Sequence, residues 1–305
     1  MPCSPMRALV RADLHVHSRA SDGTDPPAEV MRRAAAAGLD VVALTDHDTV
    51  AGHAEARDAA GPVALLPGME LSCRLGQPRR GVPGGSSPRD QHSVHMLAYL
   101  FDPDQPELAA ELARIRDDRV LRARAMVDRL AGLGVDISWD QVAAIAGPAV
   151  VGRPHIARAM AASGAIASPR EAFTSDWIAD GGRAYVARYA LDPSRAIGLV
   201  RAAGGVTVLA HPRASRDTVV SDEQIAGLAA AGMAGVEVFH PDQSDTERAR
   251  LLALARDLGL LATGGSDDHG SLTGHRLGAE ITPAEVCEAL LSRASVSPPC
   301  GKKGR

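Results

Sequence analysis

Histidines and carboxylates gather in short bursts along this 305-residue chain, and each burst follows or ends an apolar run. The first, DLHVH at residues 13–17, places Asp13, His15 and His17 on one face of a strand because side chains alternate. Two imidazoles on one face can share a metal ion, and Asp22 follows closely. A pair of hydrogen-bonded core histidines would give the same pattern, so this segment alone leaves both interpretations open.

The second burst, TDHDT at residues 45–49, comes directly after an apolar run. Burying three neighbouring titratable side chains costs free energy unless they bind something. We expect His47 to be a metal ligand. We expect the adjacent Asp46 and Asp48 to orient ligands or to cap the following helix.

Three later positions extend the pattern. Glu70 lies between other candidate ligands and could bridge two metals, with His95 on the next strand. AHP at residues 210–212 and GGSDDHG at residues 264–270 add His211, Asp267 and His269. A buried structural histidine explains each of them singly. Together the bursts follow five strands and hold six of the eleven histidines, which indicates a shared metal site.

The candidate donors are nitrogen and oxygen atoms. The four cysteines show no CxxC spacing, so neither a disulfide scaffold nor a zinc–thiolate site is predicted. Several imidazoles suit manganese, zinc or iron better than magnesium alone.

The elements that must position these residues alternate between strand and helix. Strands are predicted at 8–16, 41–44, 63–67, 94–99, 206–210, 235–239 and 260–264. Helices are predicted at 27–37, 51–60, 194–203, 222–231 and 244–258. This alternation predicts a mostly parallel α/β sheet or barrel, with its site at the carboxyl ends of the strands. Residues 77–91, rich in Gly, Pro, Ser and Arg, are expected to form a surface loop.

A helical insertion interrupts the alternation at residues 104–189, with helical patches at 139–146, 155–162 and 178–180. The barrel is therefore expected to be discontinuous, comprising residues 1–103 and 190–290. Residues 291–305 are polar and contain Pro and Gly, so we expect a disordered tail.

The bulk composition excludes some functions. A net charge of −4 argues against binding nucleic acid through a broad basic surface. Lysine occurs only at Lys302 and Lys303, so internal phosphate contacts from cationic side chains must come from arginine. No apolar run is long enough to span a membrane, and no signal peptide is evident, so we expect a cytoplasmic protein. No stable protein partner is predicted.

The segments DLHVHS, TDHDT, AHP and GGSDDHG resemble the signatures of the PHP (polymerase and histidinol phosphatase) superfamily. VGRPHIA at 151–157, GGRAYVARY at 181–189 and GVEVFHPDQSD at 235–245 are similar to its nucleoside 3′,5′-bisphosphate phosphatases and short-RNA 5′-to-3′ exonucleases. The resemblance covers roughly residues 11–282. It implies a distorted seven-stranded (β/α) barrel, with the helical insertion as a cap over the active site.

The resemblance also implies a set of metal ligands and favours manganese, with zinc or iron as alternatives, in two or three divalent ions per chain. One metal would be held by His15, His17, Glu70 and Asp267. A second would take Asp22, His47 and His269. A third would share Glu70 and add His95 and His211. The segment before His95 looks longer than the family pattern, and His92 competes for the same position.

The remaining roles are assigned on the same basis. Arg153, His155 and Arg183 would bind substrate, although a surface salt bridge explains Arg153 as well. Asp46 and His240 would take catalytic roles; His240 could equally orient a neighbour.

The implied function is metal-dependent hydrolysis by an activated hydroxide, removing the 3′-phosphate of a small nucleoside 3′,5′-bisphosphate. Three alternatives remain open: an exonuclease or phosphodiesterase acting on short oligonucleotides, a histidinol phosphatase, and a metal-binding module without catalysis.

Overall fold

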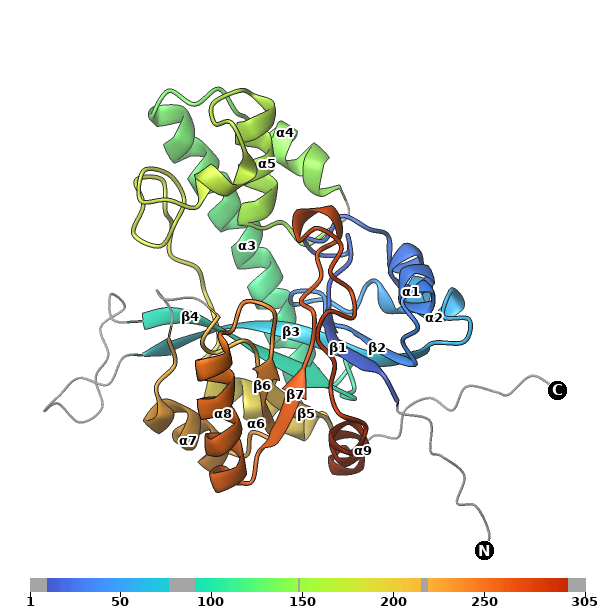
Figure 1. The fold of residues 1–305 in the computed structure, drawn as a ribbon. Coiled ribbons are helices and arrows are strands. Elements are labelled where there is room, and N and C mark those ends of the chain that lie inside the picture. Colours follow the sequence, from blue (N-terminus) through green and yellow to red (C-terminus); the bar gives the residue numbers. More distant parts are fainter. Residues whose placement is uncertain (1–9, 77–90, 148, 215–218, 296–305) are drawn as a thin grey trace, which may run out of the picture.

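Seven strands form one nearly closed barrel in the computed structural model, which describes residues 10–76, 91–147, 149–214 and 219–295 (Figure 1). Neighbouring strands follow the chain order: β1 (Ala12–Val16), β2 (Val41–Leu44), β3 (Ala64–Gly76), β4 (Gln91–Tyr99), β5 (Val206–Leu209), β6 (Gly235–Phe239) and β7 (Leu261–Gly264). The segment after β7 returns to β1, where the amide of Asp267 donates to the carbonyl of His15 (2.8 Å). The distorted seven-stranded barrel expected from the sequence is confirmed.

The direction of β4 departs from the parallel pattern. β4 runs antiparallel to both β3 and β5, whereas the other strand pairs are parallel. β3 was predicted to end at residue 67 but continues to Gly76, because residues 68–76 pair with β4 from Gly68↔Tyr99 to Gly76↔Gln91. Of the loop predicted at residues 77–91, residues 77–90 lie outside the described chain, and Gln91 begins β4.

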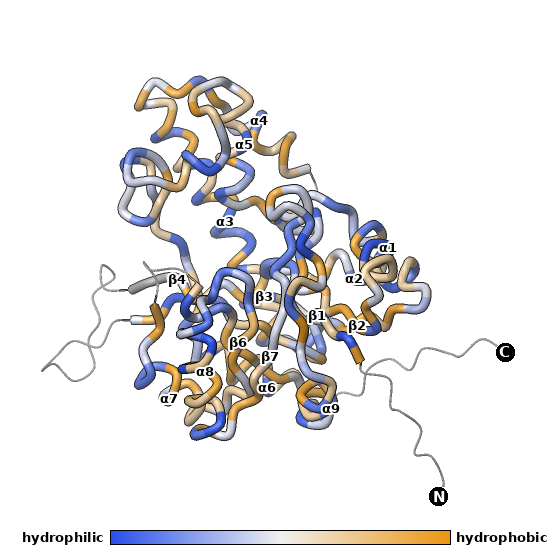
Figure 2. The backbone as a smooth tube through the Cα atoms, in the orientation of Figure 1, coloured by the Kyte–Doolittle hydropathy of each residue, from blue (hydrophilic) through white to orange (hydrophobic). Residues whose placement is uncertain are grey.

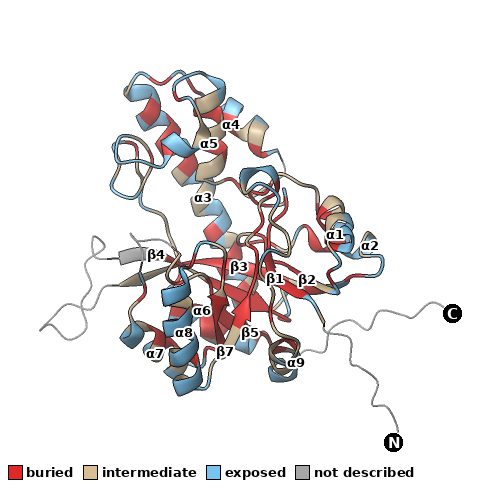
Figure 3. Cartoon of the chain, viewed as in Figure 1, coloured by how far each residue is buried: buried red, intermediate tan, exposed pale blue. Residues whose placement is uncertain are grey.

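The barrel helices pack their apolar faces against the sheet, whose strands are buried throughout the centre (Figure 3). They are α1 (Pro27–Ala36), α2 (His53–Asp58), α6 (Pro193–Ala202), α7 (Asp222–Ala230), α8 (Asp245–Leu258) and α9 (Ala284–Arg293). α9 extends to Arg293, so the tail predicted to begin at residue 291 starts as helix; residues 296–305 lie outside the described chain. In the described residues we find no helix with both the length and the apolar character of a membrane span.

The insertion rises from the barrel on one long helix, α3 (Pro106–Gly132), and carries α4 (Trp139–Ala146), α5 (Arg153–Ala162) and the short 3₁₀ helix η2 (Pro169–Ala172) (Figure 1). At 1.5 Å per residue, the 27 residues of α3 span about 40 Å. Leu108 and Leu112 near its start belong to the barrel core, whereas Met126 and Leu130 belong to the core of the insertion. Polar and apolar residues alternate along it (Figure 2). α3 therefore contributes to two hydrophobic cores and connects them.

The helical patch predicted at residues 178–180 is wrong. These residues form turns, in which Ile178 is buried in the insertion core and Asp180 forms an ion pair with Arg153. Three residues cannot offset the cost of starting a helix, and Gly181 and Gly182 follow directly.

Candidate metal centre

The nine candidate metal ligands converge at one end of the barrel, below the helical insertion. Their donor atoms form three overlapping groups, and within each group the atoms lie within 4.8 Å of one another. The groups are His15, His17, Glu70 and Asp267; His17, Asp22, His47 and His269; and His47, Glu70 and His95. His211 joins through Glu70, whose Oε1 lies 3.1 Å from His211 Nε2.

The first group is the most deeply buried. His15 and His17 project from β1 to the same face, and their Nε2 atoms face each other at 3.1 Å. Oδ1 of Asp267 lies 3.3 Å from both of these nitrogens. The alternation along β1 thus places both imidazoles as the sequence predicts.

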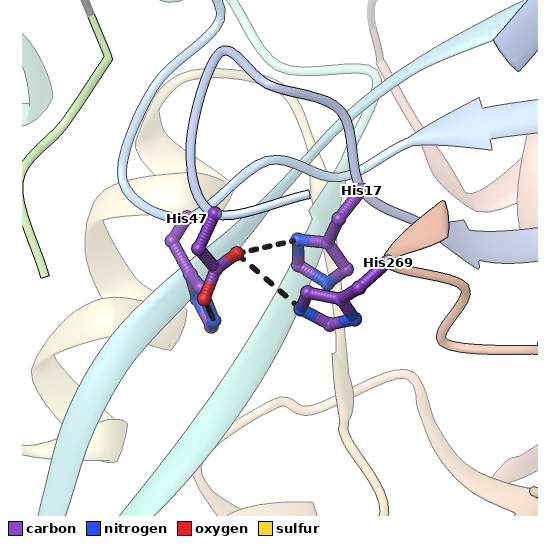
Figure 4. Close-up of side chains that lie close together, drawn as sticks. His17, His47 and His269 are labelled. Carbon is purple, nitrogen blue, oxygen red and sulfur yellow. Dashed lines mark ion pairs between the residues drawn. The ribbon is translucent and has the colours of Figure 1, made fainter. Parts of the chain in front are cut away.

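The second group gathers around Asp22, in the loop after β1. Oδ1 of Asp22 lies 3.3 Å from His269 Nε2 and 3.9 Å from His17 Nδ1, and Oδ2 lies 3.8 Å from His47 Nε2. Figure 4 shows His17, His47 and His269 converging, with dashed ion pairs to the carboxylate between them. Three segments far apart in the chain supply this group.

Glu70 connects the groups. Its Oε2 lies 3.0 Å from His17 Nε2 and 3.3 Å from His47 Nδ1, while its Oε1 lies 2.8 Å from His95 Nδ1. His95 lies in the middle of β4, and the antiparallel pairing of β4 with the extended β3 brings it to the rim where the parallel strands end. Ser72 on β3 pairs with His95, two residues beyond Glu70. This geometry suits a bridging carboxylate.

Buried polar atoms without partners support metal binding in the first two donor groups. Nδ1 of His17 and Oδ1 of Asp267 are buried and lack a hydrogen-bond partner within the described residues. Leaving buried polar groups unpaired costs about 1–3 kcal/mol each. Six imidazoles with three carboxylates form a donor set suited to divalent transition metals. The residues therefore fit divalent metal ions.

The ligands differ in their readiness to bind a metal. Although burial lowers it, the carboxylates of Asp267 and Glu70 raise the pKa of His17 to about 10, so a bound metal must displace its proton, whereas Glu70 and two other histidines are already in their metal-binding forms. Burial would raise the pKa of Glu70, but His47, His95 and His15 hold it well below its usual range. Burial lowers the pKa of His47 to about 3, so its imidazole is neutral and able to bind a metal. Burial also lowers the pKa of His95.

Buried residues outside the ligand set orient it. Glu237, in the middle of β6, lies 3.0 Å from His15 Nδ1 and accepts the amide of His211 (2.8 Å). Asp13 accepts the amides of Ser266 (2.9 Å) and Gly278 (2.8 Å), and so fixes the loop after β7. Glu237 was not predicted from the sequence, although one acidic residue inside the apolar strand GVEVF was a usable signal.

Backbone geometry at the centre is strained. Asp48, His211 and Asp267 have φ values of 54°, 26° and 49°, in a region that non-glycine residues seldom occupy. Such conformations persist where the surrounding structure enforces them, and they concentrate at functional sites. Gly265 permits the close approach of the loop after β7, since a Cβ there would lie 2.4 Å from that of His15.

Comparison with known proteins identifies the family. The PHP domain model matches residues 13–114. A 3′,5′-nucleoside bisphosphate phosphatase from Chromobacterium violaceum is 35% identical over 88% of this chain and 90% of its own length. The chain belongs to the PHP family. The resemblance seen in the sequence is confirmed, and the chain is a metal-dependent phosphoesterase by family and by its donor set.

Other relatives support this assignment. A 5′-3′ exoribonuclease from Haemophilus influenzae is 32% identical over 84% of this chain and 89% of its own length. The crystal structure of a protein from Bifidobacterium adolescentis, assigned as a metal-dependent phosphoesterase, has a TM-score of 0.82 and 35% identity, covering 93% of this chain and 96% of its own. The PHP barrel and the insertion therefore both have counterparts in known structures.

The two predicted catalytic residues beside the metal centre, Asp46 and His240, form hydrogen bonds with neighbouring residues. Asp46 accepts hydrogen bonds from the Ser18 amide and hydroxyl (both 2.8 Å) and from the Ser21 hydroxyl (2.7 Å). Burial raises the pKa of Asp46. These contacts fix the loop that carries Asp22, which is a positioning role; a catalytic role for Asp46 stays a prediction.

His240 is nearly fully buried beside Asp267. Its Nδ1 accepts the amide of Asp242 (3.1 Å), so Nε2 carries the proton and donates to Oδ2 of Asp267 (3.3 Å). This contact orients a predicted metal ligand. Proton donation to a leaving group stays a prediction.

The cap residues that were predicted to bind substrate lie in three different surroundings. Arg153 lines a pocket of about 250 Å³ together with His95 and His211, and forms an ion pair with Asp180 (2.9 Å). His155 is buried, and its Nδ1 accepts the Gly152 amide (3.0 Å). Arg183 is exposed, and no contact of its side chain with the candidate metal ligands is found among the described residues.

Three further arginines close to the centre were not predicted from the sequence. Arg119 on α3 donates to Oδ2 of Asp48 from Nε (2.9 Å) and to the hydroxyl of Ser72 (2.6 Å). Arg188 is half-buried and donates to the Ser93 hydroxyl (2.6 Å), and Arg158 lies near Asp22. Asp48 therefore does not cap a helix: α2 begins after Gly52. Arg119 and Arg158 on helices, and Arg188 in the segment before α6, carried no recognisable pattern in the sequence.

Proposed function

We propose that this protein removes the 3′-phosphate of nucleoside 3′,5′-bisphosphates. The observation that carries the proposal is the convergence of nine nitrogen and oxygen donors beneath an arginine-bearing insertion. The activity printed for the Chromobacterium violaceum relative supports this substrate class.

Each part of the site has a distinct role in this proposal. His15, His17, Glu70 and Asp267 hold one metal; Asp22, His47 and His269 hold a second; Glu70, His95 and His211 hold a third. Bound divalent metals supply activation of water and stabilisation of charge on the phosphoryl oxygens. Arg153, facing the pocket with His95 and His211, orients the reacting phosphate by bidentate hydrogen bonding.

Manganese is the metal that we propose, on the basis of the family resemblance and the imidazole-rich donor set. The cytoplasmic location and the absence of a stable protein partner are predictions from the sequence alone. Catalytic roles for Asp46 and His240 and substrate binding by Arg183 remain part of the proposal.

Phosphate release with added manganese tests the function. Adenosine 3′,5′-bisphosphate, histidinol phosphate and short 5′-phosphorylated RNA are compared at equal concentration. We expect the bisphosphate to have the highest kcat/KM. Preferred turnover of histidinol phosphate, or no turnover of any of the three, would contradict the proposal.

A 5′-to-3′ exoribonuclease is the second candidate, because relatives with that activity in their names are 30–32% identical over most of this chain. Gel analysis of 5′-labelled RNA separates the two functions. Release of 5′-mononucleotides with kcat/KM above that for the bisphosphate would favour the exoribonuclease.

A further inference from the structure

A second pocket, separate from the one that Arg153 lines, opens beside the loop that carries Asp22. Its volume is about 460 Å³, and it lies between the loop after β1 and the helices α4 and α5. Ser21, Gly23 and Thr24 form one wall, and Asp22 lies in the same loop. We call it the α4–α5 pocket. A ligand there would therefore touch the loop that carries a predicted metal ligand.

The lining of the α4–α5 pocket is cationic. Arg19 and Arg158 line it with His155, the two hydroxyls and the apolar end of α4, and no carboxylate is among its described lining residues. The carboxylate of Asp22 is engaged with His17, His47 and His269. The pocket therefore offers positive charge that no lining residue neutralises.

Arg158 has an unused donor. Its Nη2 is buried without a hydrogen-bond partner in the described chain, and its Nε makes a long contact of 3.5 Å with the Pro154 carbonyl. A buried guanidinium nitrogen without a partner is costly, and a phosphate oxygen would satisfy it. Arg153 differs, because Asp180 already accepts its Nη1.

His155 supplies a neutral donor to the same pocket. Because its Nδ1 accepts the amide of Gly152, the proton is on Nε2. Burial, helped by Arg158, lowers the pKa of His155 to about 4, so it stays neutral at pH 7. Two guanidinium groups and one imidazole N–H match the oxygens of a phosphate monoester dianion.

We propose that the α4–α5 pocket binds the 5′-phosphate of the substrate, the group that is not hydrolysed, through Arg158, Arg19 and Nε2 of His155. The inference rests on the proposed function for the identity of the substrate. It assigns the two ends of the substrate to different pockets: the reacting 3′-phosphate to the metals and Arg153, and the 5′-phosphate to Arg158.

The test measures the activity of each enzyme variant on two substrates. Arg158→Gln, Arg153→Gln and the wild type are assayed on adenosine 3′,5′-bisphosphate and on adenosine 3′-monophosphate, which lacks the 5′-phosphate. Arg158→Gln should lower kcat/KM for the bisphosphate on the order of 10- to 100-fold and that for the monophosphate less than 3-fold. Arg153→Gln should lower both similarly. Arg170→Gln, at an exposed arginine of the same insertion, is the control for charge.

Equal losses on the two substrates for Arg158→Gln would overturn the proposal, as would selective loss in Arg153→Gln instead. Circular dichroism and thermal unfolding show whether each variant is folded. If Arg158→Gln does not fold, Arg19→Gln, at an exposed position, replaces it with the same expected selectivity.

A binding measurement distinguishes failure of this inference from failure of the proposed function. Calorimetric titration with adenosine 5′-monophosphate should show about 10-fold weaker binding for Arg158→Gln, while binding of adenosine is unchanged. If the wild type hydrolyses neither substrate, the proposed function fails, but this titration still tests the pocket. Equal affinity of the wild type and Arg158→Gln for the 5′-monophosphate would refute the pocket assignment.

Discussion

The barrel rim and the cap build their parts of the site differently. At the rim, side chains extend from strands or strand ends, and buried acids such as Glu237 fix their orientation. In the cap, arginines extend from helices or from the segment that returns to the barrel, and contact backbone carbonyls, hydroxyls or acids. The rim is therefore suited to fixed metal geometry. In our proposal the chemistry belongs to the rim and the choice of substrate to the cap.

Removing one central imidazole should have the largest effect. His17 is a ligand of one proposed metal and lies beside the donors of a second, so His17→Ala should lower kcat/KM at least about 1,000-fold. Phosphate release and metal content by mass spectrometry measure this. His275→Asn, at an exposed histidine with φ of 57° that Asn tolerates, should stay within about 2-fold. Full activity of His17→Ala would exclude catalysis at this centre.

The second-largest effect is expected from breaking the ion pair that joins the rim to the cap. Arg119 on α3 neutralises the buried Asp48 on the rim, so Arg119→Gln should lower the free energy of unfolding by about 3 kcal/mol. Urea unfolding measures this change. Asp48→Asn together with Arg119→Gln should recover part of the loss, because the unpaired buried charge is removed. Additive losses in the double variant would mean that the two side chains are not coupled.

The strength of each signal explains what the sequence could predict. Histidines and acids after apolar strands are conspicuous and pointed to the strand ends, and the family resemblance named the nine candidate donors that the fold brings together. The length and direction of β3 and β4 were missed, since residues 68–76 show no turn signal before residue 77. Arg119 and Arg158 were missed because arginine is ordinary on a helix, and only packing separates a buried guanidinium from an exposed one.

Removing the charge that orients the ligand His15 should have an intermediate effect, seen in the metal affinity. Glu237→Gln keeps the shape of the side chain but removes the charge beside His15, so metal affinity should fall about 10- to 100-fold. Metal titration of kcat is the measurement, and excess metal should restore most activity. An unchanged metal affinity would show that His15 is held by packing alone.

The smallest expected effect is the contribution of His155, in the cap, to the pH dependence of the free energy of unfolding. The folded pKa of His155 is lowered to about 4 by burial, whereas an unfolded histidine titrates near 6.5. The unfolded chain therefore binds more protons as the pH falls through 6.5, and stability is lost between about pH 6.5 and 4. In metal-free protein, this residue should account for about 1 kcal/mol of the loss between pH 7 and 5.5. His155→Asn keeps an acceptor for the Gly152 amide but cannot titrate, so its urea midpoint should fall less steeply with pH. Parallel pH profiles for the two proteins would mean that His155 becomes protonated without unfolding the cap, and its imidazole would then reach solvent through the α4–α5 pocket.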